Sequence, residues 1–119
     1  MDAYSTYKEH RVMTASPGRL VVMLYDGAVR FCKQAVTQLE QGRIAEKGQS
    51  IARAIDIIQE LDVSLNLEQG GQVARDLRRL YEFMLKRLVQ ANLRQDPEMI
   101  REVIRLLEEL AEGWRAIAG

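Results

Sequence analysis

Residues 16–40 carry more apolar surface than one face of a helix can bury. An α-helix turns about 100° per residue, so apolar residues between Leu20 and Leu39 line one face. Five more residues continue the apolar surface round the cylinder: Val22, Tyr25, Val29, Cys32 and Val36. The apolar arc reaches roughly 200°, whereas a helix that faces a single core needs little more than about 100°. The pattern predicts a helix whose surplus surface meets another part of the chain, a second copy or a separate apolar partner.

Size and charge limit the classes of protein that this chain can belong to. Its 119 residues suit one domain, and 17 basic residues balance 17 acidic ones, which argues against disorder and against steering toward nucleic acid or an anionic membrane. Cys32 is the only cysteine, so no intrachain disulfide forms, and this suits a reducing cytosol. Residues 1–8 lack the apolar core of a signal peptide, and the longest apolar run, 20–25, is too short for a bilayer. We therefore expect a cytosolic protein with no membrane insertion.

Helical periodicity recurs four times, with residues that start or stop helices between the segments. Ser16-Pro17 and Asp96-Pro97 each read as an N-cap followed by proline in the first helical turn. The predicted helices run from Pro17 to about Gly42, 44–65, 73–93 and from Pro97 almost to the C-terminus. Their predicted inward faces include three residues near helix ends: Ile44, Val73 and Ile117.

Loops of a few residues cannot cross a bundle about 30 Å long, so consecutive helices must run antiparallel. The sequence therefore predicts an all-α fold, an up-down-up-down four-helix bundle over residues 16–119. Residues 1–15 remain as an N-terminal arm that forms a short helix or lies over the bundle. Four of its residues are apolar or aromatic candidates for covering the bundle: Tyr4, Tyr7, Val12 and Met13.

Residues suited to catalysis or metal binding are scarce. A di-metal bundle needs inward Glu-x-x-His pairs, and the only histidine, His10, lies in the arm. Cys32 is placed mid-helix with no histidine nearby in sequence, and Gly70-Gly71 matches no phosphate-loop spacing. The basic residues of the third helix are interleaved with Asp76 and Glu82, as on a solvated face. We expect neither an enzyme nor a nucleic-acid binder, and neither metal nor cofactor.

An ordered set of short motifs runs through residues 4–117. It comprises Thr14-Ala15-Ser16-Pro17, Met23-Leu24-Tyr25-Asp26-Gly27-Ala28, Ala54-Ile55-Asp56-Ile57-Ile58, Ser64-Leu65-Asn66 with Gly70-Gly71, Leu80-Tyr81-Glu82-Phe83-Met84 with Arg87-Leu88, Ala91-Asn92 before Asp96, and Leu106-Leu107 with Trp114. No single tetrapeptide is specific, but the ordered set closely resembles the FliS family of flagellin-specific export chaperones.

The resemblance implies a cytosolic bundle that binds the disordered C-terminal segment of newly made flagellin. Covering that segment prevents premature polymerisation, and the chaperone then delivers flagellin to the cytosolic domain of the export-gate protein of the flagellar type III secretion apparatus. It implies no nucleotide and no metal. An amphipathic segment that folds into an apolar groove as it binds loses conformational entropy. This loss offsets part of the free energy gained by burial, so the segment can still be released.

The predicted flagellin groove uses the surplus residues Val22, Tyr25, Val29, Cys32 and Val36. Tyr25 also lies in a family motif, as do Asn66 and Tyr81, which we add to the site. For Asn66, a helix C-cap that fixes the following loop is an equal alternative. Tyr7 resembles a family tyrosine of the arm that covers the groove and hands cargo to the export gate. We therefore predict Tyr4, Tyr7, Val12 and Met13 as the cap and export-gate residues.

Two other interpretations of the surplus surface stay open. Tyr25, Val29, Cys32 and Val36 can pack the arm or widen the contact with two neighbouring helices. Alternatively, the chain is a structural or regulatory helical homodimer without cargo, since a self-complementary stripe and a peptide groove use the same residues. For the chaperone, we expect a monomer or a weak homodimer in the free state.

Overall fold

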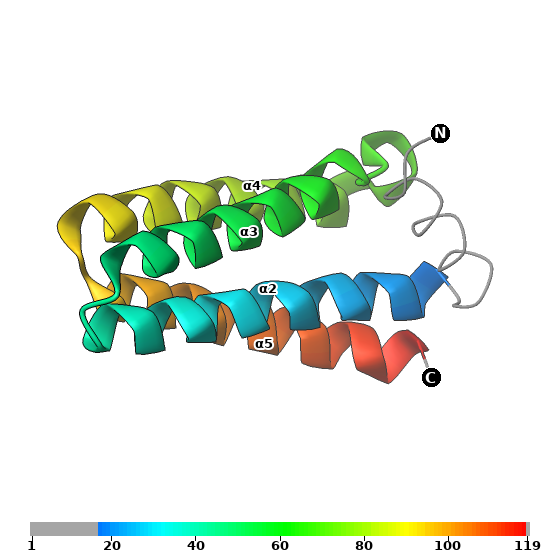
Figure 1. Cartoon of the computed structure of the whole chain (residues 1–119). Coiled ribbons are helices and arrows are strands. Elements are labelled where there is room, and N and C mark those ends of the chain that lie inside the picture. Colours follow the sequence, from blue (N-terminus) through cyan, green and yellow to red (C-terminus); the bar gives the residue numbers. More distant parts are fainter. Residues whose placement is uncertain (1–16, 119) are drawn as a thin grey trace, which may run out of the picture.

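The computed structural model describes residues 17–118, and every element in that range is a helix. The helices are α2 (Pro17–Glu40), α3 (Ile44–Val63), α4 (Leu67–Arg94) and α5 (Pro97–Ala118) (Figure 1). The predicted all-α class is confirmed. None of these helices is long and apolar enough to cross a membrane.

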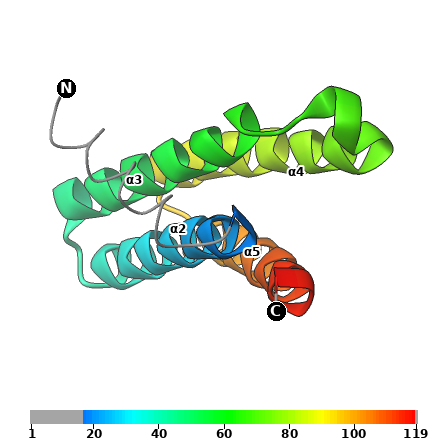
Figure 2. The ribbon, with the colours of Figure 1, turned by 90° about the vertical axis from the view of Figure 1, so that its right-hand side faces the viewer.

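Each helix packs against its neighbours in the chain, and α5 returns to pack against α2. Consecutive helices run in opposite directions, with α2 and α5 in one layer and α3 and α4 in the other (Figures 1 and 2). This arrangement confirms the predicted up-down-up-down four-helix bundle. The arm, with Tyr4, Tyr7, Val12 and Met13, lies outside the described residues, so its predicted role stays a prediction.

The core draws buried apolar residues from all four helices, among them Ala28, Ile58, Leu88 and Leu107. Three residues that the periodicity placed inward are exposed instead: Ile44 by 45%, Val73 by 69% and Ile117 by 76%. Each lies within the first or last turns of the bundle, where a helix no longer has a neighbour on every inward side. Periodicity records the face of a helix but not where its neighbours end.

The start of α4 differs from the prediction. The helix begins at Leu67 rather than at about residue 73, and Asn66 is its N-cap rather than a C-cap of α3. The Asn66 side chain accepts a hydrogen bond from the Gln69 backbone N–H at 3.0 Å. Gly71 interrupts the helix with φ 54° and ψ −131°. Gly70-Gly71 predicted a loop, but one helical turn, capped by Asn66, fits between Asn66 and the kink at Gly71.

Three ion pairs join α2 to α5 at intervals of seven residues. Asp26 pairs with Arg115, Lys33 with Glu108 at 3.4 Å, and Glu40 with Arg101 at 2.9 Å. The signs alternate along each helix, so a slip of one heptad would place like charges opposite each other. Exposed pairs add little stability, but this alternation disfavours other registers.

Polar contacts close the end of the bundle that holds the α2–α3 and α4–α5 turns. Lys47 is buried, and its Nζ donates to Oδ1 of Asn92 at 2.6 Å and to the Asn92 carbonyl at 3.2 Å, near the C-terminus of α4. Burial lowers the pKa of Lys47. The Ser50 hydroxyl and the Gln38 side-chain amide lie 2.6 Å apart and link α3 to α2. The opposite end, which faces the viewer in Figure 2, holds the site.

Candidate functional site: an apolar groove at the bundle end

A groove of about 240 Å³ opens at the end of the bundle where α3 connects to α4. All four helices contribute to it, and none of its lining residues carries a charge: Val21, Leu61, Ser64, Leu65, Asn66, Gly70, Val73, Ala74, Leu77, Tyr81 and Trp114. We call it the end groove. Three strongly exposed apolar residues lie at this same end of the bundle: Val63, Val73 and Ile117. This end therefore combines an apolar hollow with exposed apolar side chains, as docking surfaces commonly do.

Tyr81 joins the end groove to the core. Its hydroxyl forms a hydrogen bond with the Tyr25 hydroxyl, and the ring centroids lie 6.4 Å apart at 46°. Both residues are buried, so the pair links α2 and α4, which lie diagonally across the bundle. Burial raises the pKa of Tyr25, although hydrogen bonds with Tyr81 and Trp114 oppose the shift. Burial and the hydrogen bond with Tyr25 raise the pKa of Tyr81. The two hydroxyls satisfy each other in an otherwise apolar setting.

Asn66 and its neighbours form one wall of the groove. The Asn66 carbonyl accepts the Gly70 backbone N–H at 2.8 Å, in addition to the contact of its side chain with Gln69. The Ser64 hydroxyl donates to the Leu61 carbonyl at 2.9 Å. Asn66 thus lines the end groove and has a structural role there as the N-cap of α4, while its contact with flagellin stays a prediction.

The five surplus residues of α2 do not form one open stripe. Tyr25, Cys32 and Val36 are buried, whereas Val22 and Val29 are half-buried. The expectation that all five present an open surface is wrong for the first three, because α3 and α5 both pack against α2. The wider contact with two neighbouring helices accounts for the apolar arc. Burial also raises the pKa of the Cys32 thiol to about 12.

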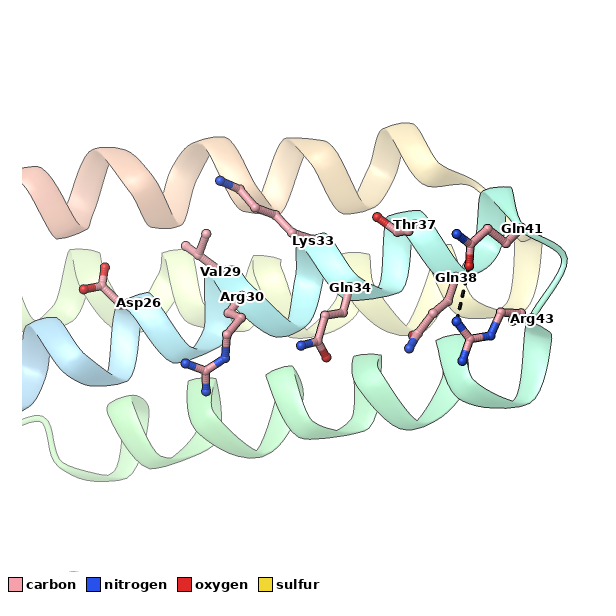
Figure 3. A pocket seen from close by; sticks show the side chains of 9 residues that line it. All are labelled: Asp26, Val29, Arg30, Lys33, Gln34, Thr37, Gln38, Gln41 and Arg43. Atoms are coloured by element: carbon pink, nitrogen blue, oxygen red, sulfur yellow. Dashed lines mark hydrogen bonds between the residues drawn. The ribbon is translucent and has the colours of Figure 1, made fainter.

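A second hollow, of about 530 Å³, lies beside α2 and is lined mostly by charged and polar residues. We call it the α2 hollow. Arg30 and Gln34 point toward α3, whereas Lys33 points toward α5 (Figure 3). Arg43 donates to the Gln41 side-chain oxygen at 3.3 Å at one end of it. Val29 is its only aliphatic lining residue, and a surface of this composition is well solvated.

The sequence interpretation missed most of the end groove. The helical periodicity gave no role to the gap between Leu61, Leu77 and Trp114, which line the groove. Two family motifs could have indicated the groove: the one that contains Asn66 and Gly70-Gly71, and the one that contains Tyr81. Among residues 17–118, no cluster of His, Cys, Asp and Glu is suited to holding a metal ion.

A family model described as "Flagellar protein FliS" matches residues 1–119. The chain belongs to the FliS family. It is 45% identical over 111 residues to the flagellar secretion chaperone FliS of Salmonella typhimurium, covering 92% of this chain and 82% of that protein. Flagellar secretion chaperone FliSB of Pseudomonas aeruginosa is 42% identical over 110 residues, covering 92% and 87%. FliS of Bacillus subtilis is 33% identical over 112 residues, covering 94% and 83%. The family resemblance of the sequence is confirmed. Flagellar secretion chaperones are not a class of enzyme.

Proposed function

We propose that this FliS chain acts in the cytosol and binds the C-terminal segment of flagellin in the end groove. Covering the segment prevents premature polymerisation, and the chain then delivers flagellin to the cytosolic domain of the flagellar type III export gate. The observation that carries this proposal is an uncharged groove at a bundle end that also exposes Val63, Val73 and Ile117. An amphipathic helix docks into such a groove through apolar side chains spaced at helical intervals.

The predicted site residues take different roles in this proposal. Tyr81 and Asn66 contribute to the floor and wall of the groove. Val22 and Val29 are half-buried and offer a secondary contact for cargo that continues along α2. Tyr25 supports the groove through its hydrogen bond with Tyr81, whereas Cys32 and Val36 are buried in the core farther along α2. The arm residues Tyr4, Tyr7, Val12 and Met13 remain proposed as the groove cap and the contact with the export gate.

Calorimetry with full-length flagellin, and with flagellin that lacks its C-terminal segment, tests the proposed partner. We expect a complex of one chain with one full-length flagellin and loss of binding on truncation. Sedimentation of the free chain checks the competing interpretation. A stable dimer that does not bind flagellin would favour the structural homodimer. Equal binding of full-length and truncated flagellin would reject the C-terminal segment as the ligand.

Two substitutions on α4 test the location of the site. Val73 lines the groove yet is 69% exposed, so Val73→Asp should leave the fold intact. Burying its carboxylate against apolar cargo should weaken binding by at least about tenfold, or about 1.4 kcal/mol. Leu93→Asp is the matched control, because Leu93 is 77% exposed near the other end of the same helix. Wild-type affinity in both variants would exclude the end groove as the cargo site.

A further inference from the structure

The end groove is too small for the helix that it is proposed to receive. A helix with its side chains is about 10–12 Å across. A dry cavity of about 150 Å³ accepts a benzene molecule, so a groove of about 240 Å³ holds one or two large side chains and no helix backbone. Burying a helix beyond its anchor side chains requires one wall to move.

The wall that contains the first turn of α4, Leu67–Gly70, is built as a separate unit. Asn66 satisfies the backbone N–H groups of Gln69 and Gly70, so the turn holds its own hydrogen bonds. Behind it, Nε of Arg78 lies 3.1 Å from Oδ1 of Asp62, which fixes the main part of α4 to α3. The turn thus lies beyond the point where α4 is anchored.

Gly71 separates this turn from the rest of α4. Its φ of 54° and ψ of −131° lie outside the helical region and are rarely adopted by residues with a Cβ. A Cβ at Gly71 would meet no atom within 4 Å, so there is room for rotation at this point. By contrast, a Cβ at Gly70 would lie 2.6 Å from Cβ of Ala74, so the turn packs closely on the helix that follows.

We propose that the Leu67–Gly70 turn is a hinged wall that rotates about Gly71 to open the end groove for cargo. The inference rests on the proposed function and adds its regulation: the described form is the closed one, and cargo selects or induces the open one. Closing the wall reduces the apolar surface that the idle chaperone exposes. Ser64 and Leu65 are hydrogen-bonded to the end of α3, so the motion widens the groove on the side formed by Asn66 and Gly70.

Tryptophan quenching of a bimane label measures this motion. Trp114 is the only tryptophan and lines the groove opposite the turn. Gln69→Cys places the label on an exposed position of the turn and keeps the backbone N–H that Asn66 caps. Cys32 is fully buried, and its thiol pKa of about 12 keeps it from competing for the label. Gln90→Cys, an exposed position farther along α4, serves as the control.

We expect the flagellin C-terminal segment to raise the emission of the label at position 69 severalfold and to leave the label at position 90 unchanged. Binding by calorimetry with unchanged emission at position 69 would overturn the hinged wall while the proposed function stands. Absence of calorimetric binding to the unmodified chain would instead reject the proposed function.

The substitution Gly71→Ala tests the hinge without cargo. A Cβ disfavours positive φ, so the free variant labelled at position 69 should already show the higher emission. Circular dichroism confirms that its bundle is folded. A folded variant with wild-type quenching would show that Gly71 is not the hinge. If the variant does not fold, the cargo titration with Gly71 intact decides between the same two outcomes.

Discussion

The end groove and the α2 hollow differ more in what lines them than in how large they are. The α2 hollow has about twice the volume, but Asp26, Arg30, Lys33 and Arg43 line it. The end groove is smaller and has no charged lining residue. A charged wall stays hydrated and must lose its water before apolar cargo can dock. Volume is therefore a weaker guide to the cargo site than composition.

The two regions also arise differently. Along the middle of α2, neighbouring helices cover most of the apolar residues on both sides, and mainly charged and amide side chains line the outside. At the end of the bundle the helices stop, so inward-facing residues such as Leu77 and Trp114 have no neighbouring helix to fill the space beside them. An apolar site can therefore result from where helices stop as well as from surplus apolar residues on one of them.

The largest expected effect is on stability and concerns Tyr25, which the sequence placed on the surface. Tyr25→Ala removes a fully buried ring and leaves the Tyr81 hydroxyl without its partner. We expect the free energy of unfolding to fall by about 3–5 kcal/mol, measured by urea unfolding. Lys33→Ala in the α2 hollow is the control and should change it by about 1 kcal/mol at most. A small loss for Tyr25→Ala would mean that α2 carries an open apolar stripe after all.

Alkaline pH offers a second measure of how deeply α2 is buried. The Cys32 pKa rises from 9.0 to about 12 on folding, and those of both tyrosines rise from 10.0. Above the unfolded pKa values the folded state binds more protons than the unfolded state. The free energy of unfolding should therefore fall above pH 9, by up to about 1.4 kcal/mol per pH unit for each group.

Urea midpoints measured from neutral pH upward check this slope, and Cys32→Ala isolates one of its causes. The variant should lose the part of the decline that begins near pH 9 and keep the part from the tyrosines that begins near pH 10. A decline that is the same in both proteins would show that the Cys32 thiol ionises as freely in the folded chain as in the unfolded one.

A smaller effect on binding is expected from Val29→Asp. Val29 is half-buried in the α2 hollow, where cargo is proposed to make only secondary contact. We expect flagellin affinity to fall by about fivefold, or about 1 kcal/mol, less than for Val73→Asp. Calorimetry on both variants measures the two losses. If Val29→Asp abolishes binding and Val73→Asp does not, the cargo surface lies along α2 and the end groove is not the main site.

The helices could be predicted because their signals are local. Pro17, Gly42 and Asp96-Pro97 mark helix ends through backbone conformation and capping, and the structure places helix ends at or within two residues of them. The start of α4 could not be predicted in the same way, because Gly70-Gly71 suits both a loop and a kinked helix. The first turn forms because Asn66 caps it and Gly71 accepts a positive φ.

The site could be predicted only where a motif, rather than a helical face, indicated it. Asn66 and Tyr81 came from family motifs, and both line the end groove. Tyr25, Cys32 and Val36 came from counting the apolar arc of α2, and all three are buried. A single helix gives no information on how many neighbours cover it, so its arc alone cannot separate a double contact from a docking surface.

The smallest expected effect concerns the charges that separate the α2 hollow from α5. Lys33 and Glu108 form an exposed pair at 3.4 Å, the middle one of the three ion pairs between α2 and α5. Lys33→Glu sets like charges against each other and should lower the free energy of unfolding by about 0.5–1 kcal/mol at low salt. Adding Glu108→Lys restores an opposite pair and should recover the loss, whereas Glu108→Lys alone should reproduce it. Because both groups are exposed, molar salt should remove most of the difference, which urea unfolding at two ionic strengths measures.

A loss that persists in the double variant would mean that Lys33 stabilises α2 through its aliphatic stem rather than its charge. The Lys33–Glu108 pair would then contribute nothing to the register of α2 and α5.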